Sequence, residues 1–277
     1  MSNASETPEL LDRTLILNGM DCVIRDRLST LRIEPSLDST NSELQRMAPE
    51  EQHATAILAE HQARGRGRRG RNWYSPHGRN LYLSLGWRFE QALSALGCLP
   101  LVVALSVAKA LSRAGLKGHW IKWPNDVFIN GRKLCGCLVE TQGDAQGPVH
   151  AVLGVGINVH MTATDETSGI DQPWTDLNSH LPACSRNGLA ALVLEELMTQ
   201  LPLFSSHGFA VFRDAWEQMD GLSGKLVHIE SGNRLLHGTA AGIDEHGALM
   251  LDNGMEVLKL HSGEVSVKLT ENGPGTF

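Results

Sequence analysis

The stretch VFINGRKLCGCLVE, residues 127–140, decides the fold class of this 277-residue chain. Two runs rich in β-forming residues flank Asn130-Gly131, and Asn-Gly between two apolar runs is the strongest short signal for a β-hairpin. The turn fixes the register of the outgoing strand and therefore the place of Lys133 on it. The sequence predicts a pair of antiparallel strands here.

Further short strands are predicted on both sides of this hairpin, because runs of β-formers are bounded by turn residues. The predicted strands are 54–60, 81–87, 120–122, 127–129, 133–140 and 151–159. Apolar residues at helical spacing predict helices over 99–114, 187–201 and 209–219. The predicted fold class is therefore α/β (α+β), with a mixed β-sheet and packed helices.

The texture of the sequence changes near residue 221. From 226 to 269, short strand-like runs and turns show no helical period, which predicts a small β-barrel. Both ends are polar or rich in glycine and proline and are predicted to be disordered. The predicted organisation is a disordered N-terminus (1–9), an α/β domain (10–220), a β-domain (221–270) and a disordered tail (271–277).

Composition excludes several classes of protein. Lys and Arg number 24 against 31 Asp and Glu, and the net charge of −7 argues against a general nucleic-acid or anionic-membrane binder. The N-terminal residues lack the basic and apolar segments of a secretory signal. The longest apolar run, 99–111, carries Lys109 and is judged too short to span a bilayer. Five cysteines, an odd number, favour a reduced, cytoplasmic protein with free thiols.

The segment RGRGRRGR, residues 64–71, places five arginines in an acidic chain. Each guanidinium is a planar fork that pairs bidentately with carboxylate or phosphate, and the glycines allow close backbone approach to a ligand. A solvated basic loop is the alternative. The alternation of Gly and Arg directly after a strand favours an anion-binding loop.

Two common nucleotide motifs are absent. The loop formally matches G-x-G-x-x-G, but the NWYSPHG segment that follows, residues 72–78, cannot open the helix of a dinucleotide-binding fold because of Pro76 and Gly78. No Walker A sequence occurs anywhere in the chain. A phosphate-bearing ligand would need a different site.

The segment KWPND, residues 122–126, offers one. Pro124 makes a rigid turn that is expected to place Lys122, Asn125 and Asp126 near one another. One cation, one amide and one carboxylate suit phosphate and Mg²⁺, which takes few protein carboxylates. A capped strand–turn without a ligand is the alternative.

Two weaker signals complete the set. Thr40 and Glu43 match a capping box, so a helix is predicted to start there with spare hydroxyls for a polar ligand. The strand GVGINV, residues 154–159, carries two glycines, which often mark close approach of a ligand or another backbone. Cys135 and Cys137 are interpreted as core residues, because no second Cys/His pair completes a zinc site.

Together these segments resemble the biotin–protein ligases in order and spacing. The matching segments are 38–41 (DSTN), 65–73 (GRGRRGRNW), 122–126 (KWPND), 132–136 (RKLCG) and 154–158 (GVGIN), and the likeness runs from about residue 10 to 268. The resemblance implies a catalytic α/β domain followed by a small SH3-like barrel. It also implies an enzyme that makes biotinyl-5′-AMP from biotin and ATP with Mg²⁺, and then transfers biotin to a lysine of a biotin carboxyl carrier domain.

The resemblance also implies roles for individual residues. Biotin would be held by Ser39, Thr40, Asn41, Gln62, Arg66, Gly67, Arg68, Lys133, Gly136, Leu138 and Gly154. ATP would be held by Arg71, Trp73, Lys122, Asn125, Asp126 and Asn158. Lys133 and Arg68 would be the catalytic cations, and Asp126 is a candidate Mg²⁺ ligand.

The chain departs from the family pattern in two places. About 35 residues precede Asp38, too few for the helix-turn-helix domain of the members that double as repressors, so no DNA binding is expected. The C-terminal Gly-Glu-x-x-x-Arg segment of the family ends here in Lys268, which cannot pair bidentately. No membrane partner is expected, and monomer and homodimer both stay open.

The expected chemistry needs cations more than a base. A carboxylate is already ionised at neutral pH, so the obstacle to adenylation is the repulsion between two anions, which Lys133 and Arg68 would offset. Transfer to a lysine amine, with an unperturbed pKa of about 10.4, needs proton removal, for which Asp126 is the nearest candidate. The loop 64–71 is predicted to be mobile until a ligand orders it and excludes water. A lipoate–protein ligase, a nucleic-acid-binding protein and an inactive relative are the alternatives.

Overall fold

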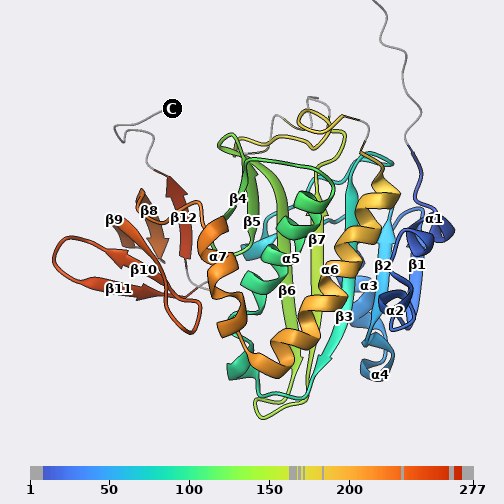
Figure 1. The fold of residues 1–277 in the computed structure, drawn as a ribbon, viewed down its shortest axis with the longest axis horizontal. Coiled ribbons are helices and arrows are strands. Elements are labelled where there is room, and N and C mark those ends of the chain that lie inside the picture. Colours follow the sequence, from blue (N-terminus) through green and yellow to red (C-terminus); the bar gives the residue numbers. More distant parts are fainter. Residues whose placement is uncertain are drawn as a thin grey trace, which may run out of the picture.

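The structure is a computed structural model, and it describes residues 9–161, 167, 170, 172–182, 184–231, 234–261 and 265–269. Two β-sheets lie next to each other, a seven-stranded one within residues 30–157 and a five-stranded one within residues 226–269 (Figure 1). The first sheet carries helices on both faces, whereas the second is built from strands and turns. The predicted fold class, a mixed α/β part followed by a smaller β part, is confirmed.

The larger sheet contains every strand that the sequence predicted before residue 160, and one more. Its strands are β1 (Thr30–Glu34), β2 (Thr55–Ala59), β3 (Leu81–Phe89), β4 (His119–Lys122), β5 (Asp126–Ile129), β6 (Arg132–Gly143) and β7 (Val149–Ile157). Their order is β1-β2-β3-β7-β6-β5-β4, with β1 parallel to β2 and the other neighbours antiparallel. The sheet is therefore mixed, and β1 is the strand that the sequence did not reveal.

The hairpin between β5 and β6 forms as predicted. Asn130 and Gly131 have φ values of 50° and 72°, the left-handed pair that a two-residue turn with the right twist requires. Phe128 then pairs with Lys133, after a register shift between Val127 and Phe128. This places the Lys133 side chain on the face of the sheet that carries Asp126.

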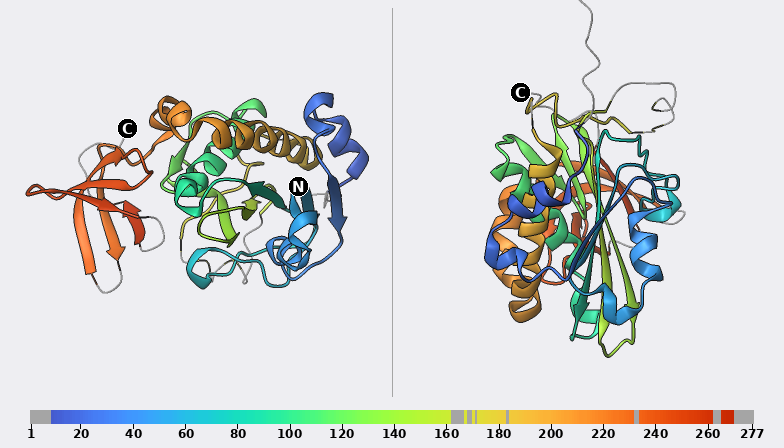
Figure 2. Two further views of the ribbon diagram at one scale, coloured as in Figure 1. Left: turned by 90° about the horizontal axis from the view of Figure 1, so that it is seen from below. Right: turned by 90° about the vertical axis from the view of Figure 1, so that its right-hand side faces the viewer.

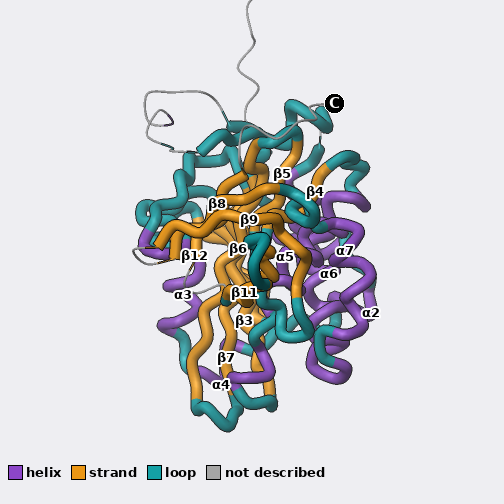
Figure 3. Tube along the Cα trace, turned by 90° about the vertical axis from the view of Figure 1, so that its left-hand side faces the viewer, coloured by secondary structure: helices purple, strands orange, loops and turns teal. Residues whose placement is uncertain are grey.

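Helices cover the two faces unequally. They are α1 (Arg13–Asn18), α2 (Cys22–Arg25), α3 (Thr40–Arg46), α4 (Pro49–Gln52), α5 (Leu99–Arg113), α6 (Arg186–His207) and α7 (Arg213–Met219). The long helices α5 and α6 bury the main hydrophobic core against one face, and the short helix α3 lies on the other (Figures 2 and 3). Much of the α3 face is thus left for loops and polar side chains.

Helix α5 is a core element, although its sequence could be mistaken for a membrane span. With the turn before it, it forms an apolar segment over 93–113 with a mean hydropathy of 1.9, long enough by length and composition to cross a bilayer. The apolar run 99–111 in the sequence is therefore shorter than the apolar segment 93–113 of the structure. In the fold, Val102, Val103 and Leu105 are buried between the sheet and α6, which accounts for the hydropathy without a membrane.

The second sheet is antiparallel and rests on α5. Its strands are β8 (Leu226–Ser231), β9 (Arg234–Ile243), β10 (Leu249–Asp252), β11 (Val257–Leu260) and β12 (Val265–Leu269), in the order β11-β10-β9-β8-β12. The indole Nε1 of Trp123 donates to the Gly247 carbonyl at 3.0 Å. A Cβ at Gly247 would lie 2.5 Å from Leu101 and 2.9 Å from Cys98, so this turn fits closely onto α5.

The ends of the chain depart from the prediction at one residue. Residues 1–8 and the predicted tail, 271–277, lie outside the described residues, as do Ser262, Gly263 and Glu264 and the side chain of Lys268. Glu9, predicted to be disordered, instead accepts hydrogen bonds from Ser185 Oγ at 2.7 Å and from Arg186 N at 2.6 Å. A carboxylate beside the start of α6 is favourably placed, because exposed N–H groups are concentrated there.

Candidate active site

The predicted site residues gather on the α3 face of the larger sheet. They come from the start of α3, the loop over 62–75, the turn before β5, the start of β6 and the end of β7. Gly136 pairs with Gly156, and Leu138 pairs with Gly154, so β6 and β7 bring their predicted residues side by side. Segments far apart in the sequence therefore meet on one surface.

The two predicted catalytic cations converge on Asn125 and Asp126. Lys133 Nζ lies 2.7 Å from Asp126 Oδ2, and both side chains are about four-fifths buried, at 17% and 21% exposed. Arg68 Nη1 donates to Asn125 Oδ1 at 2.9 Å. Burial lowers the pKa of Arg68 from its usual value, and the nearby Asp126 carboxylate opposes that shift.

Asn125 is held by two hydrogen bonds to Cys137 of β6. Its Nδ2 donates to the carbonyl of Cys137, and its own carbonyl accepts from Cys137 N at 3.0 Å. Because the amide is fixed in this way, its oxygen points at Arg68 with little freedom. The turn that Pro124 introduces therefore positions side chains, as the sequence predicted.

Trp73 lies over Gly136 of β6 and Gly156 of β7, and Gly156 is one of the two strand glycines for which the sequence predicted a close approach. A Cβ at Gly156 would come within 2.6 Å of the indole, and one at Gly136 within 3.0 Å. Lys133 Nζ stands 5.4 Å from the ring centroid, within cation–π range. The buried Trp73 Nε1 has no hydrogen-bond partner among the described residues. The close approach that the glycines predicted is thus made by an aromatic side chain.

A buried polar cluster forms where α3 meets β3. Thr40 N and Oγ1 both donate to Gln62 Oε1, at 2.9 and 3.2 Å. The buried Ser84 Oγ lies 2.7 Å from Thr40 Oγ1 and 2.5 Å from Asn41 Oδ1. A Cβ at Gly154 would overlap the Asn41 amide, so this glycine makes room for the side chain above it. Ser84 was missed because a lone serine in an apolar strand carries no motif.

The predicted capping box at the start of α3 is wrong, although the helix starts where predicted. Ser39 is the N-cap residue and makes no side-chain cap, while Thr40 is already helical. Glu43 pairs instead with Arg32 at 3.1 Å and Arg46 at 3.0 Å. Two guanidinium partners give charge-assisted bonds that a single backbone amide does not match. The carboxylate therefore turns away from the helix start.

The side chain of Arg66 points away from the cations. Arg66 Nη2 donates to Glu140 Oε2 at 2.7 Å and to Gln45 Oε1 at 3.1 Å. Its guanidinium thus spans from β6 to α3, instead of reaching the cluster around Asp126. Glu140 is a second residue that sequence reasoning missed, since it stands at the far end of a strand-like run.

Other predicted ATP residues are placed less directly. Asn158 Nδ2 donates to the Thr175 carbonyl at 3.0 Å, so it holds the segment that runs beside β6. In the strand register, Lys122 of β4 lies opposite Asp126 of β5. Lys122 Nζ lies 5.1 Å from the Phe128 ring centroid. Arg71 is exposed, and its carbonyl accepts from Gly67 N at 2.7 Å within the loop.

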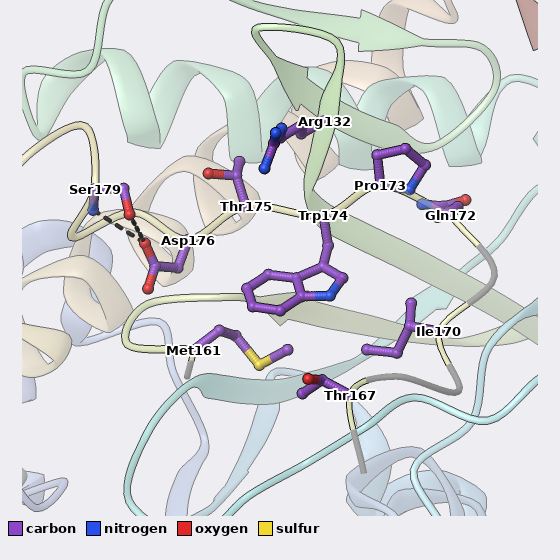
Figure 4. Close-up of a pocket in the computed structure, with 10 residues that line it drawn as sticks. All are labelled: Arg132, Met161, Thr167, Ile170, Gln172, Pro173, Trp174, Thr175, Asp176 and Ser179. Carbon is purple, nitrogen blue, oxygen red and sulfur yellow. Dashed lines mark hydrogen bonds between the residues drawn. The ribbon is translucent and has the colours of Figure 1, made fainter. Parts of the chain in front are cut away.

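A hollow of about 730 Å³ opens beside the backbone of Lys133 (Figure 4). Its described lining is Arg132, Met161, Thr167, Ile170, Gln172, Pro173, Trp174, Thr175, Asp176 and Ser179. Lys133 N donates to the Pro173 carbonyl and Thr175 N to the Lys133 carbonyl, both at 2.9 Å. The Trp174 indole lies across the hollow, which the sequence did not predict because 161–176 matches no motif.

A magnesium ion would find one protein carboxylate here. Within the described residues, no group of three His, Cys, Asp or Glu side chains could hold a metal by itself. Asp126 stands alone beside Lys133, which suits an ion that takes most of its ligands from phosphates and water.

Comparisons with known proteins agree along the whole chain. Residues 34–158 match the Biotin/lipoate A/B protein ligase family, and residues 222–268 match the Biotin protein ligase C terminal domain. The bifunctional ligase/repressor BirA of Escherichia coli (strain K12) is 36% identical over 96% of this chain and 81% of its own length. The biotin--[acetyl-CoA-carboxylase] ligase of Paracoccus denitrificans is 35% identical over 77% of this chain and 90% of its own length.

A solved structure shows the same fold. The biotin protein ligase from Aquifex aeolicus in complex with biotin and ATP superposes with a TM-score of 0.75 and 28% identity. The match covers 87% of this chain and 100% of that one.

Proposed function

The chain belongs to the biotin protein ligase family, and we propose that it makes biotinyl-5′-AMP from biotin and ATP and then transfers biotin to a lysine of a carboxyl carrier domain. Its relatives support each substrate in turn. The Aquifex aeolicus protein is described with biotin and ATP bound, and the Paracoccus denitrificans relative is named for acetyl-CoA carboxylase.

One observation carries this proposal. Arg68 and Lys133 come from distant segments and meet around Asn125 and Asp126, on a face that also holds Trp73. Two fixed cations at one spot can bring a carboxylate and a triphosphate together, because they offset the repulsion between the two anions. Holding the reactants in place supplies the rest of the rate enhancement.

In the first step, a carboxylate oxygen of biotin would attack the α-phosphorus of ATP. A new O–P bond forms, the bond to the β-phosphate oxygen breaks, and pyrophosphate leaves. Lys133 and Arg68 would stabilise the charge that builds on the α-phosphate. Asp126 would be the protein ligand of Mg²⁺, which would neutralise charge on the triphosphate.

The resemblance to the family suggests the binding roles. The polar cluster of Thr40, Asn41 and Gln62 would hold the biotin head group, next to Gly154. Trp73 would pack on the adenine. Arg66 would support the loop, because its guanidinium is already bound by Glu140 and Gln45.

In the second step, the acceptor lysine attacks the acyl carbon and AMP leaves. The amine must first lose a proton, since its usual pKa of about 10.4 keeps it charged. Asp126 is the nearest carboxylate to the reacting cations and would take that proton. Closure of the loop 64–71 would protect the adenylate from water until the acceptor arrives.

Biotin-dependent exchange of pyrophosphate into ATP tests the first step. Lys133→Ala removes one of the two cations and should slow exchange by a factor on the order of 10²–10³. Lys259→Ala is the matched control, because Lys259 pairs with Asp244 in the second sheet and its side chain is 58% exposed. If Lys133→Ala exchanged pyrophosphate at the rate of the native chain, the proposal would be contradicted.

Lipoate is the second candidate substrate, because the matching family includes lipoate ligases. A ligand at 100 times its Kd stabilises the folded state by about 2.7 kcal/mol. Biotin should therefore raise the thermal midpoint, while lipoate at the same concentration should not. If lipoate alone raised the thermal midpoint, lipoate and not biotin would be the substrate.

A further inference from the structure

Glu140 lies outside the cluster of cations, yet it connects two parts of the site. Its Oε2 accepts from Arg66 Nη2 at 2.7 Å and from Asn41 Nδ2 at 2.8 Å. One oxygen thus binds the arginine loop on one side and the buried Asn41 amide on the other. The same Arg66 Nη2 also donates to Gln45 Oε1 of α3 at 3.1 Å, so Glu140 is one of two acceptors that hold this guanidinium.

Asn41, on one side of this contact, is fixed in place. Asn41 is buried, its Oδ1 lies 2.5 Å from Ser84 Oγ, and its amide fills the space that Gly154 leaves free. Because Asn41 has so little room, its Nδ2 holds the Glu140 carboxylate in one position. The carboxylate is 25% exposed and can therefore receive a partner from the solvent side.

The loop side of the contact is adjustable. Arg66 is 37% exposed and reaches Glu140 from a segment without a hydrophobic core of its own. The loop is also joined to the fold by Arg66 Nη2 to Gln45 Oε1 at 3.1 Å, by Arg64 N to the Asp38 carbonyl at 2.8 Å and by Arg68 Nη1 to Asn125 Oδ1 at 2.9 Å. Arg68 follows Arg66 by two residues, so the place of Arg66 sets the reach of Arg68.

We infer that Glu140 is a positioning residue that couples ligand binding at the buried polar cluster around Asn41 to closure of the arginine loop. A ligand that tightens Asn41 also fixes Glu140, and Glu140 then holds Arg66 and with it the closed loop. This inference rests on the proposed function for the identity of the ligand, biotin. The contact between Glu140 and Arg66 itself needs no ligand.

Trypsin reports loop opening directly, because the loop carries five arginines. Cleavage of a transiently open segment follows the population of the open form when opening and closing are fast. Glu140→Gln removes the charge of the anchor and should raise the ligand-free cleavage rate about 3- to 10-fold, the upper value corresponding to about 1.4 kcal/mol. Arg66→Gln cuts the same contact, together with the one to Gln45, and removes one of the five trypsin sites. Cleavage at the other four arginines should rise in the same way.

The control is Glu90→Gln. Glu90 pairs with Arg88 at 3.1 Å, is 72% exposed and stands at the end of β3. Its loop cleavage should match that of the native chain. Equal cleavage of Glu140→Gln and Glu90→Gln without ligand would overturn the anchor, whatever the protein binds.

Biotin tests the coupling. It should protect the loop of the native chain several-fold more than that of Glu140→Gln. In the exchange assay, Glu140→Gln should raise the KM for biotin about tenfold and leave kcat within about twofold, a split that a general loss of stability would not produce. Equal protection of both chains would overturn the coupling while the exchange activity stands.

The double variant Glu140→Gln/Arg66→Gln completes the cycle. If the two residues act through one contact, the double variant should be cleaved at the remaining four arginines no faster than Arg66→Gln alone. Additive rates would show independent effects and would sink the inference. Loss of exchange in every chain, the native one included, would count against the proposed function and leave the ligand-free cleavage result intact.

Discussion

At Gly156, the absence of a side chain leaves the space in which the Trp73 indole packs. The Trp73 indole rests where a Cβ would come within 2.6 Å of it, a separation that real side chains do not tolerate. The ring must therefore shift if a methyl group is added. The same holds more mildly for Gly136, where the separation would be 3.0 Å.

Gly156→Ala should therefore impair the nucleotide site without unfolding the protein. We expect the KM for ATP to rise by about tenfold, equivalent to about 1.4 kcal/mol, with a change in tryptophan fluorescence because Trp73 moves. Exchange kinetics and emission spectra measure the two effects.

Gly188→Ala serves as the control, since a Cβ there would meet only Ser185 at 3.6 Å. An unchanged KM and an unchanged spectrum in Gly156→Ala would show that the ring does not depend on this glycine.

Two contacts lie at residues that the motifs singled out. Arg68 donates to Asn125 and Lys133 pairs with Asp126, while the roles given to these residues stay a proposal. Ser84 and Glu140 could not be predicted, since each sits in a strand whose pattern is satisfied without it. Arg66 was given a ligand, although its partner is the Glu140 carboxylate from the chain itself.

Among the elements, the β5–β6 hairpin sets Lys133, the proposed catalytic lysine, in place. Its turn holds Gly131 at φ 72°, a conformation that glycine adopts freely and alanine does not. Lys133 follows two residues later and depends on the turn for its register.

Gly131→Ala should cost about 1 kcal/mol of folding free energy and lower the thermal midpoint by about 2–4 °C for a chain of this size. Exchange activity should fall as well, because Lys133 loses its fixed register. Thermal unfolding and the exchange assay check both. Gly97→Ala is the comparison, because Gly97 is right-handed at φ −55° and should tolerate alanine.

Element prediction succeeded where periodicity was strong and failed where contacts decide. The strands of the larger sheet and helix α5 follow from their apolar patterns. Strand β1 was missed because its short TLRIE sequence mixes charged and apolar residues, and its pairing with β2 is a tertiary contact. The capping box at α3 failed because Glu43 pairs with Arg32, a tertiary contact, and with Arg46, its i,i+3 neighbour on the same helix.

At the scale of the whole molecule, Asp220 stands where the two sheets are joined, and we keep 220–221 as the proposed domain boundary. Gly221 N donates to the Ile121 carbonyl at 3.0 Å, so the junction pairs with β4. Burial raises the pKa of Asp220 above its ordinary value, opposed by hydrogen bonds from the Leu222 and Ser223 backbone and by Lys225. The folded state therefore carries a penalty when this carboxyl is ionised.

Asp220→Asn should remove that penalty while keeping the acceptor for Leu222 N. A raised folded-state pKa means that the native chain loses stability relative to the variant as the pH rises from about 3.8 through the raised value. The variant should thus be the more stable chain at pH 7, and the gap should narrow toward pH 4.

Urea unfolding of both chains across this range measures the gap. Asp26→Asn, at an exposed carboxyl, is the control. A gap that is constant with pH would contradict the expected role of burial.

Trp123 gives the molecule a remote vulnerability. Its indole is bound by a carbonyl of the Gly247 turn, and the residues right after it are Pro124, Asn125 and Asp126. A screen for inactive chains should accordingly return substitutions at 244–248, a turn of the second sheet that carries none of the proposed site residues. Such mutants would keep every proposed site residue but lose the contact that holds the segment 123–126 in position.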